Sequence, residues 1–382
     1  DALVWHPSLG EAGFGTARRS PQPHDEERGP RLAFADGTES IFLADLSGDG
    51  LADLVRIRNG EVCYWPNLGY GRFGAKVGMD NAPHFDNPDQ FDPKRLRLAD
   101  IDGSGTTDII YLHRDGVRLY FNQSGNGWSA PTRLAAFPSV NDLIHVMPVD
   151  LLGNGTACLV WSSPLPGDTR RPLRYVRLMG EHKPHLLVTI KNNLGAETQF
   201  GYAPSTKFYL HDKAAGQPWV TRLPFPVHVV EQVETVDYVS RTRFVTRYAY
   251  HHGFFDGEER EFRGFGMVEQ SDSEAFEDYV VGVQRIEGAQ ELAPELVQPP
   301  VTTRTWFHTG ALLDQGRFIH QYHKEYYQQS QHLPEPALPA GMSAAELREC
   351  ARALKGLALR KEVYSFDGSP AEQHPYTVVE NT

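Results

Sequence analysis

Short apolar runs recur along the first half of the chain, each directly behind a segment rich in Asp and Gly. The runs at 54–57, 109–112 and 159–161 combine β-branched and aromatic residues, a pattern typical of buried β-strands. The segments before them begin at residues 45, 100 and 150, so the pattern repeats after 55 and then after 50 residues. This regular spacing predicts similar structural units packed side by side.

A second pattern lies between these segments. Residues 4–15, 64–74 and 120–129 each read as an aromatic strand, a Gly-rich turn and another strand. Together with the acidic segments they give about four short strands per repeat, the size of a β-propeller blade. We count one partial unit, two full units and a degenerate last one, and expect the missing blades before Asp1. Residues 1–180 are predicted to form part of a β-propeller, and the acidic segments resemble the loops of FG-GAP or VCBS blades.

Longer alternation of apolar and polar residues begins at about residue 185. Runs at 185–191, 198–202, 227–236 and 242–250 keep the period of two that is typical of extended strands. Residues 181–382 are therefore predicted to form antiparallel strands of a large β-sheet shell. The predicted fold class of the whole chain is all-β.

One short helix is predicted near residues 343–355. Ser343 and Glu346 have the spacing of a capping box, and Gly356 is placed to end the helix. An apolar stripe indicates the face that packs on the sheet; it consists of Leu347, Cys350, Ala351 and Leu354.

Composition limits the class of protein. The chain has 382 residues, enough for at least two domains, and its mean hydropathy is −0.45. No run of eighteen apolar residues is present, so no membrane-inserting helix is predicted. A net charge of −12 argues against nucleic acid or anionic lipid as the main partner. The start at Asp1, without Met or a basic leader, suggests a fragment without a visible signal peptide.

The acidic segments 45–53 and 100–108 are the strongest candidates for a chemical site. Oxygen-bearing groups at alternating positions, with glycines that permit a tight fold, suit calcium, which takes six to eight oxygen ligands. An EF-hand is excluded because its twelfth position would be Arg56 rather than Glu. The predicted metal ligands are Asp45, Ser47, Asp49, Leu51 and Asp53 in the first loop, and Asp100, Asp102, Ser104, Thr106 and Asp108 in the second.

The alternative is that these loops are Asp-rich turns whose carboxylates bind their own main-chain N–H groups without metal. The third copy, 150–158, carries Leu152 and Cys158 where ligands are needed, and we expect it to bind no ion.

Other polar clusters give weaker signals for chemistry. The histidines at 251–252 and at positions 320 and 323 lack a completing set of zinc ligands. The charged stretch 256–266 is more typical of cross-strand ion pairs than of acid–base catalysis. The sequence contains no nucleophile elbow, zinc-protease motif or dinucleotide fingerprint, and we predict that the chain is not an enzyme.

Several motifs in order resemble a known family. The acidic loops are followed by Thr-Arg-Tyr-Ala-Tyr at 246–250, Arg-Glu-Phe-Arg-Gly-Phe-Gly at 260–266 and Ala-Arg-Ala-Leu-Lys-Gly at 351–356. This order resembles the middle region of the B subunit of bacterial Tc insecticidal toxin complexes. A weaker resemblance connects the first half with the C-terminal part of the Salmonella virulence protein SpvB.

The resemblance implies a secreted bacterial virulence protein, exported by a non-classical route, that acts as a scaffold. In that family a β-propeller docks on the pore-forming A subunit and gates release. An Rhs-type shell encloses the toxic C-terminal fragment of the C subunit. The acidic loops alone permit another hypothesis, a calcium-dependent adhesion or glycan-binding propeller. An ADP-ribosyltransferase such as SpvB would need a catalytic domain that the sequence does not contain.

Overall fold

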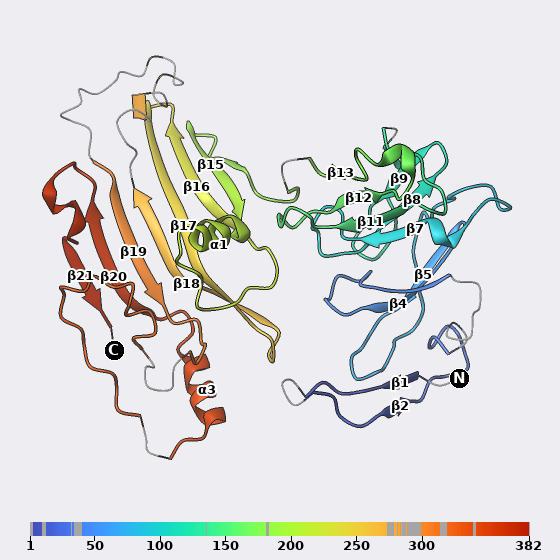
Figure 1. Ribbon diagram of the computed structural model, residues 1–382, viewed down its shortest axis with the longest axis horizontal. Helices are drawn as coiled ribbons and strands as arrows, with labels where there is room; N and C mark the ends of the chain where they lie inside the picture. Colours follow the sequence, from blue (N-terminus) through green and yellow to red (C-terminus); the bar gives the residue numbers. More distant parts are fainter. Residues whose placement is uncertain are drawn as a thin grey trace. The chain divides into compact units, whose positions relative to one another are not determined.

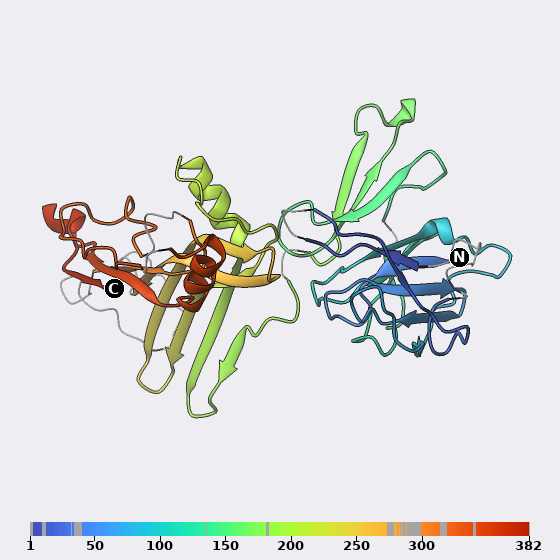
Figure 2. The same ribbon diagram turned by 90° about the horizontal axis from the view of Figure 1, so that it is seen from below.

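The chain divides into two compact units, unit 1 from Asp1 to His185 and unit 2 from Leu186 to Thr382. The computed structural model (Figures 1 and 2) describes residues 3–9, 13–31, 33, 40–134, 136–180, 183–272, 279–280, 282, 284, 288, 299–313, 319–338 and 341–381.

The described residues of unit 1 form four small antiparallel sheets whose neighbouring strands follow one another in sequence. The four-stranded repeat predicted from the sequence is present in the second and third sheets, and the first and last sheets are shorter. The sheets are β1 (Leu3–Trp5) and β2 (Arg18–Ser20); β3 (Ile41–Ala44), β4 (Asp53–Arg58), β5 (Glu61–Trp65) and β6 (Val77–Gly78); β7 (Leu96–Ala99), β8 (Asp108–His113), β9 (Gly116–Tyr120) and β10 (Thr132–Leu134); β11 (His145–Val149), β12 (Cys158–Ser162) and β13 (Leu173–Arg177).

Two hydrophobic cores of unit 1 are each shared between successive sheets. Strand β8 is buried on both faces because its side chains alternate between two cores. Ile109 and Tyr111 pack with residues of β4 and β5, whereas Ile110 and Leu112 pack with residues of β11 and β12. A single sheet therefore buries its apolar face only when the next one is present.

Unit 2 is built on one eight-stranded antiparallel sheet whose order follows the sequence. Its longest strands, β17 and β18, pair from Thr246 opposite Asp272 to Asp256 opposite Glu261, with a register shift near Gly253. The strands are β14 (Thr189–Lys191), β15 (Ala196–Pro204), β16 (His228–Asp237), β17 (Thr242–Asp256), β18 (Glu261–Asp272), β19 (Val301–Phe307), β20 (Ala358–Ser365) and β21 (Thr377–Glu380). The prediction of an all-β chain is confirmed at this level.

The helices both confirm and correct the sequence prediction. Helix α3 (Ala344–Ala353) begins with the predicted capping box between Ser343 and Glu346. The prediction of a single short helix was wrong, because α1 (Ser205–Ala214) follows β15. Its signal is weak, since it has no clear apolar stripe and no side-chain cap at Pro204. No helix in the described part of the chain is long and apolar enough to cross a membrane.

Buried charges hold the C-terminal end of the sheet in unit 2. Arg360 is fully buried, and its guanidinium lies 2.6 Å from Glu362 and 2.5 Å from Glu380. His320 bridges Glu380 and Glu335, at 2.5 and 3.0 Å. These five residues come from positions up to 60 residues apart in sequence.

Candidate functional site: the acidic loops

The three acidic segments form the connections from β3 to β4, from β7 to β8 and from β11 to β12. In each loop the carboxylate at the first position accepts the main-chain N–H of the glycine at the sixth. The N–O distances are 2.8 Å from Gly50 to Asp45, 2.9 Å from Gly105 to Asp100 and 2.8 Å from Gly155 to Asp150. Gly50 and Gly105 have φ of 84° and 94°, values that L side chains adopt only with strain.

In the first two loops, the carboxylate at the ninth position is hydrogen-bonded to the aromatic, Gly-rich segment that follows in the same repeat. Asp108 is buried, and it accepts the N–H of Ile101 at 2.8 Å and that of Asn122 at 2.8 Å. Asp53 likewise accepts from Leu46 at 3.0 Å and from Asn67 at 2.9 Å. Sequence reasoning missed the part played by the two asparagines, although each follows its aspartate by 14 residues. That constant offset was the available signal.

Successive loops are also bonded to one another. The N–H of Thr107 donates to the carbonyl of Asp45 at 2.8 Å, and the N–H of Ala157 donates to the carbonyl of Ile101 at 3.2 Å. The Asn122 side chain adds a bond to the carbonyl of Leu46 at 3.0 Å. The acidic loops thus connect one sheet of unit 1 to the next.

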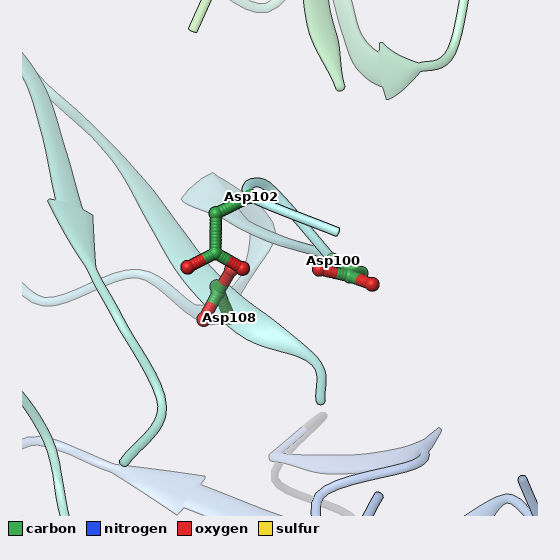
Figure 3. A group of neighbouring side chains, drawn as sticks. All are labelled: Asp100, Asp102 and Asp108. Atoms are coloured by element: carbon green, nitrogen blue, oxygen red, sulfur yellow. The ribbon is translucent and has the colours of Figure 1, made fainter. Parts of the chain in front are cut away.

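The structure gathers the carboxylates of the second loop but not those of the first. Asp100, Asp102 and Asp108 place one oxygen each within 4.8 Å of the others, the one such group among the described residues. Figure 3 shows the carboxyl groups of Asp102 and Asp108 turned toward each other. The loops differ in sequence at this point, because the third position is Asp102 in the second loop and Ser47 in the first.

The remaining predicted ligands mostly serve the loop backbone. Asp49 is exposed and accepts the N–H of Leu51 at 2.8 Å. The Ser47 hydroxyl lies 3.4 Å from Asp45. The hydroxyls of Ser104 and Thr106 lie 3.1 Å apart in the second loop, beside the three gathered carboxylates.

Burial and neighbouring charges shift the acidity of the second loop. Burial, together with the nearby carboxylates of Asp102 and Asp100, raises the pKa of Asp108 to about 7. Burial also raises the pKa of Asp100. For Asp102, hydrogen bonds from His185 and Ser104 outweigh the effect of burial and hold the pKa below its usual value.

Two basic residues at the end of unit 1 lie on the second loop. His185 Nε2 is 2.9 Å from a carboxylate oxygen of Asp102, and the Lys183 ammonium donates to the carbonyl of Gly103. No sequence pattern pointed to these contacts, because the residues are 83 and 80 positions apart. The Lys183 ammonium places positive charge beside the acidic cluster.

The side-chain oxygens of the second loop are the type of ligand that a hard cation prefers. Asp100, Asp102 and Asp108, with the hydroxyls of Ser104 and Thr106, offer the oxygen ligands that calcium prefers. The same carboxylates already accept main-chain N–H groups, so the loop also closes by its own hydrogen bonds. Calcium binding stays a prediction, and the second loop is where the carboxylates for it are assembled.

Comparison with known proteins now assigns the family. The family model described as the insecticide toxin TcdB middle/N-terminal region matches residues 122–285, and the middle/C-terminal region of the same toxin matches residues 349–382. The chain belongs to the family of Tc toxin B subunits. The resemblance inferred from the motifs is thereby confirmed.

Solved structures of Tc toxins have the same fold as this TcdB-family chain. The Photorhabdus luminescens Tc holotoxin pore is 31% identical over 99% of the chain, with a TM-score of 0.77. A TcdB2–TccC3 complex is 27% identical over 100% of the chain, with a TM-score of 0.76. TcdB2–TccC3 without its hypervariable C-terminal region is 32% identical over 96%, with a TM-score of 0.75.

The TcdB-family chain corresponds to only part of these relatives. It covers 17%, 21% and 16% of the three matched chains, respectively. No curated protein matches the sequence at a significant level.

Proposed function

We propose that the chain is part of a non-enzymatic scaffold subunit of a secreted bacterial toxin complex. In this proposal unit 1 supplies blades of a β-propeller that docks on the pore-forming A subunit and gates release. Unit 2 supplies the first part of an Rhs-type shell around the toxic fragment of the C subunit. The observation that carries the proposal is the similarity to the Tc holotoxin pore over 99% of the chain at 31% identity.

Features of unit 1 support the propeller part of the proposal. Its successive sheets are antiparallel meanders of up to four strands, the arrangement found within propeller blades. Neighbouring sheets share their cores, as blades do, and the loops at 100–107 bond to those before and after them. A ring of such blades would provide a rigid collar with an opening on its axis.

The long sheet of unit 2 supports the shell part. Its eight strands follow one another without a crossover, and β17 alone has 15 residues. Large apolar side chains remain exposed on unit 2, including Leu194 at 82%, Tyr376 at 69% and Phe244 at 68%. Such surface is expected to be covered in an assembled protein.

Complex formation by the full-length protein tests the proposal. Coexpression with its C component should give one species that elutes together from a size-exclusion column, protecting the toxic fragment from added protease. Separate elution of the two proteins, with the fragment cleaved at the rate of the free C component, would contradict the shell role.

The adhesion or glycan-binding alternative is not adopted. It was based on the acidic loops alone, and it gives no role to the eight-stranded sheet, which forms unit 2. The comparisons that assign the family support a toxin subunit instead.

A further inference from the structure

Unit 1 has a cleft at the end of its third sheet that faces away from the acidic loops. The acidic loop 100–107 joins β7 to β8, and in an antiparallel meander the next turn, from β8 to β9, lies at the opposite end. The cleft lies between this turn, the segment 92–97 that enters β7, and the segment 137–145 that enters β11. Its volume is about 770 Å³.

Part of the cleft floor is apolar. Leu112 and Val117, on either side of the β8–β9 turn, and Ile144, before β11, line it and belong to the core shared by the second four-stranded sheet and its successor. Phe137 adds an aromatic ring that packs on the same core. An apolar floor of this kind favours an occupant that carries apolar groups.

The half-buried Arg97 carries a positive charge that is held in place in the cleft by main-chain carbonyls. The Arg97 guanidinium donates to the carbonyl of Val146 at 2.6 Å and to those of Lys94 and Leu96 at 2.7 Å each. Among the described residues it donates to no carboxylate. Burial lowers the pKa of Arg97, which shows that its charge is partly removed from water. A guanidinium in this position gains from an anionic partner.

The lining as a whole, Arg97 included, carries one more cationic than anionic side chain. Four Lys or Arg side chains and three Asp side chains line the cleft, in a chain whose net charge is −12. Charges of both signs already have partners: Arg114 lies 3.7 Å from Asp86, outside the lining, and two of the aspartates are also engaged. Asp92 accepts the N–H of Lys94 at 2.9 Å, and Asp115 pairs with Arg118 at 3.7 Å and Arg133 at 3.5 Å, both outside the lining.

We propose that this cleft binds an acidic peptide segment of a partner protein. Carboxylates of the segment would pair with Arg97, Lys94 and Arg95, while its apolar side chains cover the floor. A free inorganic anion would use the charges but leave most of the volume and all of the apolar floor unfilled. Taking the occupant to be a protein rests on the proposed function as a toxin-complex subunit.

The test uses the full-length protein and two readouts. The probe is a fluorescein-labelled peptide of alternating glutamate and leucine, followed by fluorescence anisotropy; the same variants are then measured for binding to the purified A component. The cleft variant is Lys94→Glu with Arg95→Glu. The charge-reversal control is Arg72→Glu, at an exposed arginine in the β5–β6 connection, outside the cleft. Thermal melting verifies that the variants fold.

The proposal predicts that wild type and Arg72→Glu bind the peptide alike, and that the cleft variant binds at least about tenfold more weakly. A peptide with glutamine in place of glutamate should bind weakly to all three. Equal binding by the cleft variant, or complete displacement by millimolar inorganic phosphate, would overturn the peptide site. Failure of wild type to bind the A component would contradict the proposed function separately, because the peptide readout does not depend on it.

Discussion

The two units stabilise their buried carboxylates by different means. In unit 1, Asp53 and Asp108 are held by main-chain N–H groups of their own repeat. In unit 2, Glu362 and Glu380 are held by the buried guanidinium of Arg360. Amide donors carry only partial charge, so they do not fully compensate the buried Asp108, whose pKa is raised. The arginine of unit 2 supplies a full counter-charge from within the fold.

The largest expected effect is in unit 2. Replacing Arg360 with Met leaves Glu362 and Glu380 buried without their counter-ion, which we expect to cost about 3–5 kcal/mol of the free energy of unfolding of unit 2. Chemical denaturation followed by circular dichroism measures this. The control is Arg352→Met, because Arg352 pairs with Glu259 at the surface, where a pair contributes about 1 kcal/mol or less. Similar losses in both variants would contradict the role given to burial.

Unit 1 should instead lose stability as the pH rises from about 4 to about 7. The folded-state pKa of Asp108 is about 7 against an ordinary value of 3.8, so the folded state binds the extra proton in this window. Because a difference of one between the folded and unfolded pKa corresponds to 1.36 kcal/mol, the loss is of the order of 4 kcal/mol when complete. Asp108→Asn should flatten this dependence, measured by melting in chelator across that range. The exposed Asp89→Asn serves as control, and an unchanged slope in Asp108→Asn would contradict the prediction.

Calcium binding should distinguish the second acidic loop from the first. Because only the second loop gathers its carboxylates, calcium at 100 times its Kd should stabilise unit 1 by about 2.7 kcal/mol in wild type. The effect should persist in Asp49→Asn and be largely lost in Asp102→Asn. Isothermal calorimetry and melting with and without chelator measure it. Identical melting of the wild type under both conditions would mean that hydrogen bonds alone close the loops.

The smallest expected effect concerns a locally encoded element of unit 2. Ser343 accepts the N–H of Glu346 at 3.3 Å, and Glu346 accepts that of Ser343 at 2.8 Å. Ser343→Ala should cost about 1 kcal/mol, well below the effect of Arg360→Met. Hydrogen exchange at the start of α3 would locate the loss, and a cost equal to that of Arg360→Met would contradict this ranking.

The comparison also explains what the sequence could predict. The Asp- and Gly-rich turns of the acidic loops and the capping box at Ser343 are local patterns, and each is present in the structure. Helix α1 was not predicted because its sequence has no apolar stripe. Its position is set by packing on β15 and β17, which local sequence does not reveal. The contacts of His185 with Asp102, and of Arg360 with Glu380, join residues distant in sequence, and no spacing rule reveals them.

Binding of the full-length protein to its purified A component, by biolayer interferometry at neutral and acidic pH, tests the central claim most directly. The scaffold proposal predicts that the intact B subunit binds the A component tightly and that an unrelated β-propeller does not. Absence of binding at both pH values, with both proteins folded, would contradict the assignment of this chain to a docking scaffold.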